Sequence, residues 1–256
     1  KRISILELSL KYKYKDFESA KKCRSCHPGF YEQWSQSMMS QAYTHHWDEI
    51  EYFDLAVAHA EAKPELKDAV DGCNGCHTPI GFMGGPLPPP RPAAKSMANE
   101  SVSCEVCHLI QSTQTDPPFN FSYMIKPGMT KYAVRKPAVE SPAHKIVTTD
   151  FMRTTEFCGT CHNEKDPFGI WVKSTQLEWK EGPYAKEGVF CQDCHMPKGT
   201  YLTALMTKPY NDTRMHLFHG GHDPGKVRGT IELRIEPDMR EAEPGEVLVF
   251  TVVLFN

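Results

Sequence analysis

Cys23-Arg24-Ser25-Cys26-His27 is the first of five copies of the pattern C-x-x-C-H in this chain of 256 residues. The other copies are Cys73-Asn-Gly-Cys76-His77, Cys104-Glu-Val-Cys107-His108, Cys158-Gly-Thr-Cys161-His162 and Cys191-Gln-Asp-Cys194-His195, and together the five contain all ten cysteines. In this pattern two thiols form thioethers with the vinyl groups of a haem, and the adjacent imidazole ligates the iron. We therefore predict five covalently bound haem c groups, with His27, His77, His108, His162 and His195 as proximal iron ligands.

Zinc sites and thiol redox pairs also use two cysteines separated by two residues. Neither kind of site needs a histidine directly after the second cysteine, and all five copies have one. A disulfide framework leaves the same histidines unexplained. The pattern therefore favours haem attachment over these alternatives.

The composition predicts a fold built largely around the cofactor. Five haems leave about 51 residues of polypeptide for each one, so the macrocycles must form much of the core. The 20 prolines and 17 glycines interrupt regular structure. We expect a mainly α fold with extensive irregular loops wrapped around five c-type haems, and a first domain at residues 1–225.

Residues 226–256 have the pattern of β-strands. Residues 230–236 alternate between polar and apolar side chains, Pro244-Gly245 marks a turn, and residues 246–255 are β-branched and apolar. We predict a separate C-terminal β segment, either the start of a β-sandwich or strands that pair with something else, because two strands alone make a marginal sheet.

Several connecting segments can also be predicted. Residues 31–62 contain few helix breakers and indicate a helix, while residues 84–92 are rich in proline and glycine and indicate an extended connector. Residues 116–142 are similarly broken and are expected to wrap a haem face. Residues 30–37 and 175–184 share an aromatic pattern around Trp34 and Trp179, which indicates either an internal repeat or a chance likeness of two helical turns.

Charge and compartment exclude some partners. The formal net charge is -3, and haem propionates add about two negative charges per haem, so we expect no nucleic-acid partner. Covalent haem attachment takes place outside the cytoplasm in bacteria and archaea, which predicts a periplasmic, extracellular or cell-surface protein. Residues 1–16 lack the apolar core of a signal peptide and are expected to begin a processed or trimmed chain.

The sixth ligand of each iron decides between electron transfer and substrate chemistry. Seven histidines lie outside the motifs, a surplus over five irons that favours filling the sixth positions: His45, His46, His59, His144, His216, His219 and His222. The segment from His216 to His222 is the densest source, although a zinc or copper site is an alternative there. Met39 is a thioether candidate, with ordinary helix packing as its alternative.

The quoted residues resemble a family of multihaem cytochromes c. The first four motifs, the segment Trp34-Ser-Gln-Ser-Met-Met39-Ser-Gln-Ala42 and His144 resemble the tetrahaem electron acceptor of hydroxylamine oxidoreductase, in the cytochrome c-554-like superfamily. The fifth motif is similar to one found in larger cytochromes of that superfamily. The resemblance covers residues 20 to about 225.

The resemblance implies closely packed haems and a partial set of distal ligands. The position of Met39 is usually a histidine in the family, so this chain implies either one histidine/methionine haem or a ligand moved to His45 or His46. The positions of His144, His216 and His222 match distal ligands. One haem of the tetrahaem relative lacks a protein sixth ligand, so the resemblance also allows an open iron.

We therefore expect a pentahaem electron carrier that works with redox protein partners, as a periplasmic shuttle or as part of an extracellular or respiratory conduit, rather than an enzyme. One alternative is a nitrite, hydroxylamine or sulfur-oxyanion reductase with an open iron, whose site could be lined by Arg135, Lys136, Lys145 and Tyr184. The other is a structural subunit of a membrane complex or of a cytochrome filament.

Overall fold

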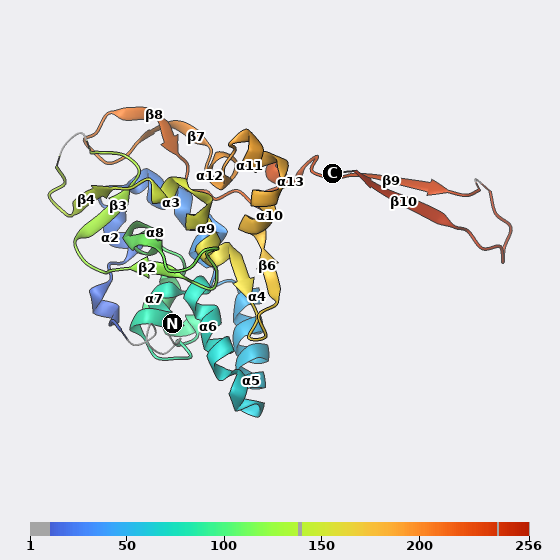
Figure 1. Ribbon diagram of the computed structural model, residues 1–256, viewed down its shortest axis with the longest axis horizontal. Coiled ribbons are helices and arrows are strands. Elements are labelled where there is room, and N and C mark those ends of the chain that lie inside the picture. Colours follow the sequence, from blue (N-terminus) through green and yellow to red (C-terminus); the bar gives the residue numbers. More distant parts are fainter. Residues whose placement is uncertain (1–10, 138–139, 240, 256) are drawn as a thin grey trace. The chain divides into compact units, whose positions relative to one another are not determined.

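A computed structural model describes residues 11–137, 140–239 and 241–255, drawn in colour in Figure 1. The chain divides into two compact units, residues 1–218 and residues 219–256. The predicted domains 1–225 and 226–256 stay a prediction, because this division describes packing within one chain and not independent folding.

The first unit consists mainly of short helices joined by irregular loops, as the composition predicts. Its α-helices are α2 (Ala20–Arg24), α3 (Pro28–Ser35), α4 (His46–Glu49), α5 (Ala58–Ala62), α6 (Lys67–His77), α7 (Pro79–Gly84), α8 (Cys104–Leu109), α9 (Thr155–His162), α10 (Thr175–Glu181), α11 (Pro183–Glu187) and α12 (Cys191–His195). The 3₁₀ segments are η1 (Tyr14–Asp16), η2 (Met38–Gln41), η4 (Pro64–Leu66), η5 (Pro92–Ala94), η6 (Met97–Glu100) and η7 (Phe151–Arg153), and η3 (Ile50–Val57) is a π-helix.

The strands of the first unit form separate two-stranded pairs between the helices. The antiparallel pairs are β1 (Ile110–Thr113) with β2 (Tyr123–Ile125), β5 (Asn163–Lys165) with β6 (Trp171–Ser174), and β7 (Lys198–Leu202) with β8 (Pro209–Arg214). β3 (Thr130–Ala133) and β4 (Lys145–Thr148) run parallel. Pairs of this size have no core of their own, and they fasten the loops. The segment 116–142 contains β2 and β3 between irregular stretches, and its contact with a haem face stays a prediction.

The helix predicted over residues 31–62 is wrong in its middle. The chain leaves the helical path after α3, where the backbone N–H and the hydroxyl of Ser37 both donate to the carbonyl of Trp34. Helical structure then resumes at α4 and continues through η3 to the end of α5. The connector over residues 84–92 is confirmed, since no regular element lies between α7 and η5.

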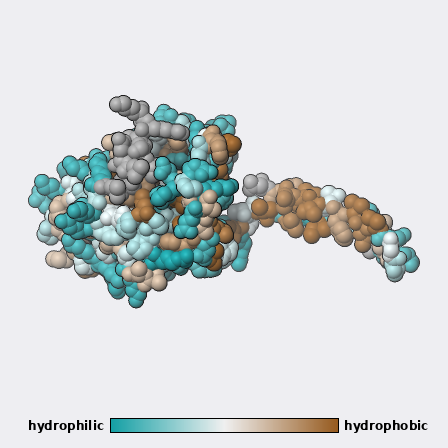
Figure 2. Space-filling view, turned by 90° about the horizontal axis from the view of Figure 1, so that it is seen from below, coloured by the Kyte–Doolittle hydropathy of each residue, from teal (hydrophilic) through white to brown (hydrophobic). Residues whose placement is uncertain are grey.

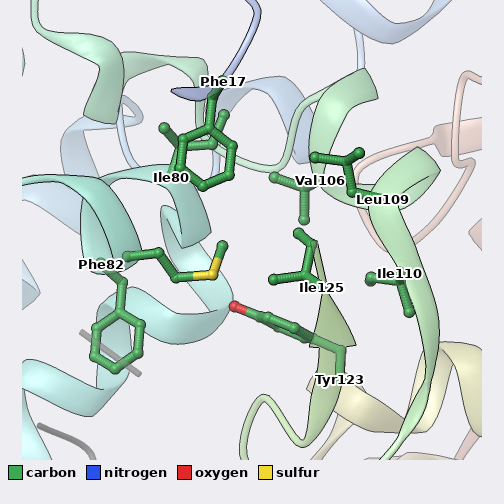
Figure 3. Close-up of a cluster of buried hydrophobic side chains, with 9 residues drawn as sticks. Phe17, Ile80, Phe82, Val106, Leu109, Ile110, Tyr123 and Ile125 are labelled. Atoms are coloured by element: carbon green, nitrogen blue, oxygen red, sulfur yellow. The ribbon is translucent and has the colours of Figure 1, made fainter. Parts of the chain in front are cut away.

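The main apolar core lies between the helices of the second and third motifs. Figure 3 shows its buried side chains, which come mainly from α7, α8, β1 and β2: Phe17, Ile80, Phe82, Met83, Val106, Leu109, Ile110, Tyr123 and Ile125. The Tyr123 hydroxyl donates to the carbonyl of Gly75 at 2.6 Å, inside the second motif. This core therefore fixes α6 and α8, which carry two of the motifs, against each other.

The second unit contains α13 (Pro224–Val227) and a hairpin of β9 (Glu232–Pro237) and β10 (Phe250–Phe255). The two strands predicted here are confirmed, and they pair antiparallel from Phe250 opposite Pro237 to Phe255 opposite Glu232. The apolar side chains of the hairpin are mostly exposed, and they form a brown band in Figure 2. Among the helices of the described residues, none has the length and apolar character needed to cross a bilayer.

Candidate haem-binding sites

Short helices present the two thiols of the motifs. In α6, α8, α9 and α12 the cysteines stand three residues apart, so both side chains lie on one face of the helix. The motif histidine ends α6, α9 and α12 and is the last residue but one of α8. None of the ten cysteines pairs in a disulfide, so all ten are available to form thioethers. The first motif differs, because α2 ends at Arg24 and His27 precedes α3.

Backbone carbonyls orient several motif imidazoles. The Nδ1–H of His108 donates to the carbonyl of Tyr132 at 2.7 Å, that of His77 to Ala42 at 2.8 Å, and that of His27 to Thr203. A carbonyl can only accept, so Nδ1 carries the proton and Nε2 is left to ligate a metal. Burial also lowers the pKa of His108 and of His162, which favours the neutral form that ligation needs.

Two of the predicted distal histidines face motif histidines. The ring centres of His27 and His144 are 6.3 Å apart, and those of His108 and His216 are 6.4 Å apart. Two metal–nitrogen bonds of about 2 Å each, with about 1 Å from each nitrogen to its ring centre, add up to about 6 Å. The donor pairs therefore fit an iron between them.

The surroundings of His216 and His144 agree with this fit. His216 donates from Nδ1 to the carbonyl of Arg214 at 3.0 Å, and burial lowers the pKa of His216 to about 4. The Nδ1 atom of His144 is buried without a hydrogen-bond partner, and burial lowers the pKa of His144 as well. In both rings burial therefore favours the neutral imidazole, which is the form that can ligate a metal.

The other distal candidates of the first unit have different surroundings. The rings of His45 and His46 are 4.5 Å apart, and the Nδ1 atom of His45 accepts from the backbone N–H of Trp47 at 3.3 Å. His59 is exposed on α5, and Met39 lies in η2 with its carbonyl bound to the N–H of Val102. Their role as ligands stays a prediction.

His219 and His222 belong to the second unit, where the Nδ1 atom of His219 pairs with the carboxylate of Asp223. The zinc or copper alternative needs three or more donors together. Within residues 11–137, 140–239 and 241–255, no group of three or more histidine, cysteine, aspartate or glutamate side chains is arranged to hold a metal ion.

Contacts between thiols show which motifs are neighbours. Three pairs of thiols from different motifs are neighbours: Cys23 and Cys104, Cys76 and Cys161, and Cys158 and Cys191. The Sγ atom of Cys76 also lies 4.0 Å from the carbonyl oxygen of Cys161. Cys107 is also close enough to Cys158 to raise the pKa of the Cys158 thiol by its charge. The first motif therefore adjoins the third, the third adjoins the fourth, and the fourth adjoins both the second and the fifth.

Two tryptophans make equivalent contacts, which bears on the repeat indicated by the sequence. The indole N–H of Trp34 donates to the carbonyl of Val102 at 2.8 Å, and that of Trp179 donates to Val189 at 2.7 Å. Each valine stands two residues before the first cysteine of a motif. The two aromatic segments therefore have the same structural role, which a chance likeness does not explain.

Sequence reasoning missed two acidic residues at these sites. Glu105 lies within the third motif and is 1% exposed, and Lys131 binds both of its carboxylate oxygens at 2.8 and 2.7 Å. Asp48 lies in α4 with its Oδ1 atom 3.2 Å from Nδ1 of His77. The local signal for each was a carboxylate close in sequence to a cysteine or histidine of a candidate site. Carboxylates are common on helices, so this signal does not single out Glu105 or Asp48.

Two family models match different parts of the chain. The model described as cytochrome c554 and c-prime matches residues 22–109, which contain the first three motifs. The model described as the NapC/NirT cytochrome c family, N-terminal region, matches residues 141–227, which contain the last two. The two matches together include all five C-x-x-C-H copies.

A solved structure has a similar fold, and a search of curated proteins found no match. A penta-heme cytochrome c552 from Thermochromatium tepidum aligns with a TM-score of 0.57 and 18% sequence identity, over 93% of this chain. This chain spans 65% of the length of that relative. The motifs and the two family matches show a multihaem c-type cytochrome that binds haem c covalently, and the fold is similar to that of the solved structure.

Proposed function

We propose that this protein binds five haem c groups and carries single electrons along them between redox protein partners. The observation that carries the proposal is the unbroken series of contacts among the motifs, from the first through the third and fourth to the second and fifth. Haems attached at adjoining motifs lie near one another, which is what electron transfer from one to the next requires. Bound haem iron supplies the one-electron redox chemistry.

The donor pairs favour electron transfer over substrate chemistry. His27 with His144, and His108 with His216, would each hold one haem iron between two imidazoles, and an iron held in this way would have no position for a substrate. Burial lowers the pKa of both His108 and His216, which favours the neutral imidazoles that ligation needs. We therefore propose His144 and His216 as distal ligands at the first and third motifs.

No specific observation favours the reductase. Its site would need cationic side chains above a vacant iron, but Arg135 pairs with the carboxylate of Asp212 and stacks over the ring of Tyr210 at 4.2 Å. Tyr184 is 57% exposed on α11. These two side chains are engaged or solvated elsewhere, so electron transfer remains the better interpretation.

We further propose that the protein works outside the cytoplasm, in the periplasm or at the cell surface, and that it docks with other redox proteins. Covalent haem attachment supports this location. Assembly into a membrane complex or filament is a second candidate, favoured by the exposed apolar side chains on both β9 and β10. Size-exclusion chromatography of native material separates a monomeric shuttle from an assembled subunit.

Haem counting and spectroscopy test the proposal. Intact-mass analysis and a pyridine haemochrome assay should give five haems per chain. His144→Ala and His216→Ala should each convert one haem from low to high spin in the electron paramagnetic resonance (EPR) spectrum, because each substitution removes one iron ligand. Phe30→Leu is the control, since the Phe30 ring packs 4.6 Å from that of His216 but supplies no ligand. A lower haem count, or unchanged spin states in both histidine variants, contradicts the proposal.

A further inference from the structure

The histidine of the second motif has a partner that those of the first and third motifs lack. The Nδ1–H of His77 lies 2.8 Å from the carbonyl of Ala42 and 3.2 Å from the Oδ1 atom of Asp48. The Nδ1–H groups of His27 and His108 instead donate to the carbonyls of Thr203 and Tyr132. The Oδ1 atom of Asp48 therefore lies within ion-pair distance of the Nδ1 atom of His77.

The fold holds Asp48 in this position. It lies in the first turn of α4, and its side chain is 23% exposed. Its Oδ2 atom is 4.0 Å from the Nδ1 atom of His45, so the two carboxylate oxygens face two imidazoles. The neighbouring Glu49 carboxylate is directed to Arg91 at 3.6 Å. The negative charge next to His77 therefore comes from Asp48.

A carboxylate bound to the far nitrogen of a ligating histidine increases the electron donation of that histidine to the metal. It also places a negative charge near the metal, which favours the more positive oxidation state. A backbone carbonyl gives a weaker form of the first effect and carries no net charge. At His77, both effects therefore favour the oxidised metal and lower its reduction potential.

Resting on the proposed electron-transfer function, we propose that Asp48 is a positioning residue that lowers the reduction potential of the haem attached at Cys73 and Cys76, below that of an equivalent site with carbonyl partners alone. Cys76 adjoins Cys161 of the fourth motif. Relative to a site without Asp48, this shift would increase the driving force for electron transfer from the second motif to the fourth.

Redox titration of the haem-loaded protein, followed by absorbance, tests the proposal. Asp48→Asn removes the charge and keeps the size of the side chain, and it should favour reduction of one of the haems about tenfold, a rise of about 59 mV in one midpoint potential. Asp48→Glu keeps the charge and should recover at least part of the wild-type value. The EPR signal of the same haem should shift in the asparagine variant, because the donor strength of one axial ligand changes.

Glu51→Gln is the matched control. Glu51 is exposed on the next helical turn and does not contact His77. Glu51→Gln removes the same charge as Asp48→Asn, and the haem potentials of this variant should stay at the wild-type values. Asp48 also lies where a carboxylate stabilises a helix N-terminus. If this were its only role, Asp48→Asn would lower the unfolding midpoint and leave every potential unchanged. Unchanged potentials in Asp48→Asn, with five haems counted on the same sample, overturn this inference and leave the proposed function standing. A count below five overturns the proposed function instead.

Discussion

The region around the first and third motifs and the region around the fourth and fifth motifs have the same plan. In each region the first cysteines of two motifs are in contact, as Cys23 with Cys104 and Cys158 with Cys191. In each, a tryptophan that follows one motif donates to the carbonyl two residues before the other. The shared contacts show that one arrangement of two motifs occurs twice in the chain.

The two regions differ in the residue that follows the first cysteine of the second motif of each pair. Glu105 is buried as an ion pair with Lys131, which also donates to the carbonyl of Gly128 at 2.9 Å. Gln192 is buried too, but its amide N–H groups donate to the carbonyls of Met152 and Thr154 at 3.0 and 2.9 Å. The same position therefore holds charges in one region and a neutral amide in the other. The plan therefore accommodates either a buried ion pair or an amide whose Nε2 atom is hydrogen-bonded and whose buried Oε1 atom has no hydrogen-bond partner.

The largest expected effect comes from breaking the buried ion pair. Lys131→Met leaves the Glu105 carboxylate without its partner in a site that is 1% exposed, which should lower the free energy of unfolding by about 3–5 kcal/mol. Denaturant unfolding of the haem-loaded protein measures this. The double variant Glu105→Leu/Lys131→Met should recover most of the loss, because it removes both charges at once.

Lys173→Met is the matched control in the other region. Lys173 and Glu164 form an ion pair at 3.3 Å between β6 and β5, with side chains that are 41% and 46% exposed. Solvent screens such pairs, so the same substitution should cost about 1 kcal/mol or less. Equal losses in Lys131→Met and Lys173→Met would show that burial does not distinguish the two regions.

The two tryptophans should give the next largest effect. Trp34→Phe and Trp179→Phe each remove one indole N–H and leave a valine carbonyl without that donor, at a cost of about 1–3 kcal/mol when the carbonyl stays dry. Trp34 is buried and Trp179 is half-buried, so the loss at Trp34 should be larger. Thermal unfolding of both variants compares the two sites. A larger loss at Trp179 would contradict the equivalence of the two contacts.

Local patterns predicted the features that depend on neighbouring residues. The alternation before Pro237 predicted β9, and the prolines and glycines of residues 84–92 predicted the connector between α7 and η5. The break after α3 was not predictable in this way, because Ser37 is an acceptable helix residue and its two bonds to Trp34 appear only in the folded chain.

Contacts between distant residues were beyond the sequence. Glu105 and Lys131 are 26 residues apart, and Ala42 and His77 are 35 apart. His144 faces His27 of the first motif, although the third and fourth motifs are nearer in sequence. Where large cofactors fill the interior, their size and orientation decide which loops meet, and no local pattern encodes those distances. The set of distal ligands accordingly stays a prediction.

The smallest expected effect is a pH dependence confined to the first region. Burial raises the pKa of the Glu105 carboxyl above its ordinary value of 4.5, and Lys131 only partly opposes this. The folded state therefore holds the proton of Glu105 more tightly than the unfolded state does, so this residue adds stability below pH 4.5 that is lost as the pH rises through its folded pKa. The difference in unfolding free energy between the wild type and Glu105→Leu/Lys131→Met should fall over this window. Gln192 does not titrate, so Gln192→Leu should change stability by an amount that is constant with pH. A flat difference for the double variant would show that the pKa of Glu105 is the same in the folded and unfolded states, so that burial and Lys131 cancel. A difference that rises with pH would show that Lys131 outweighs the burial.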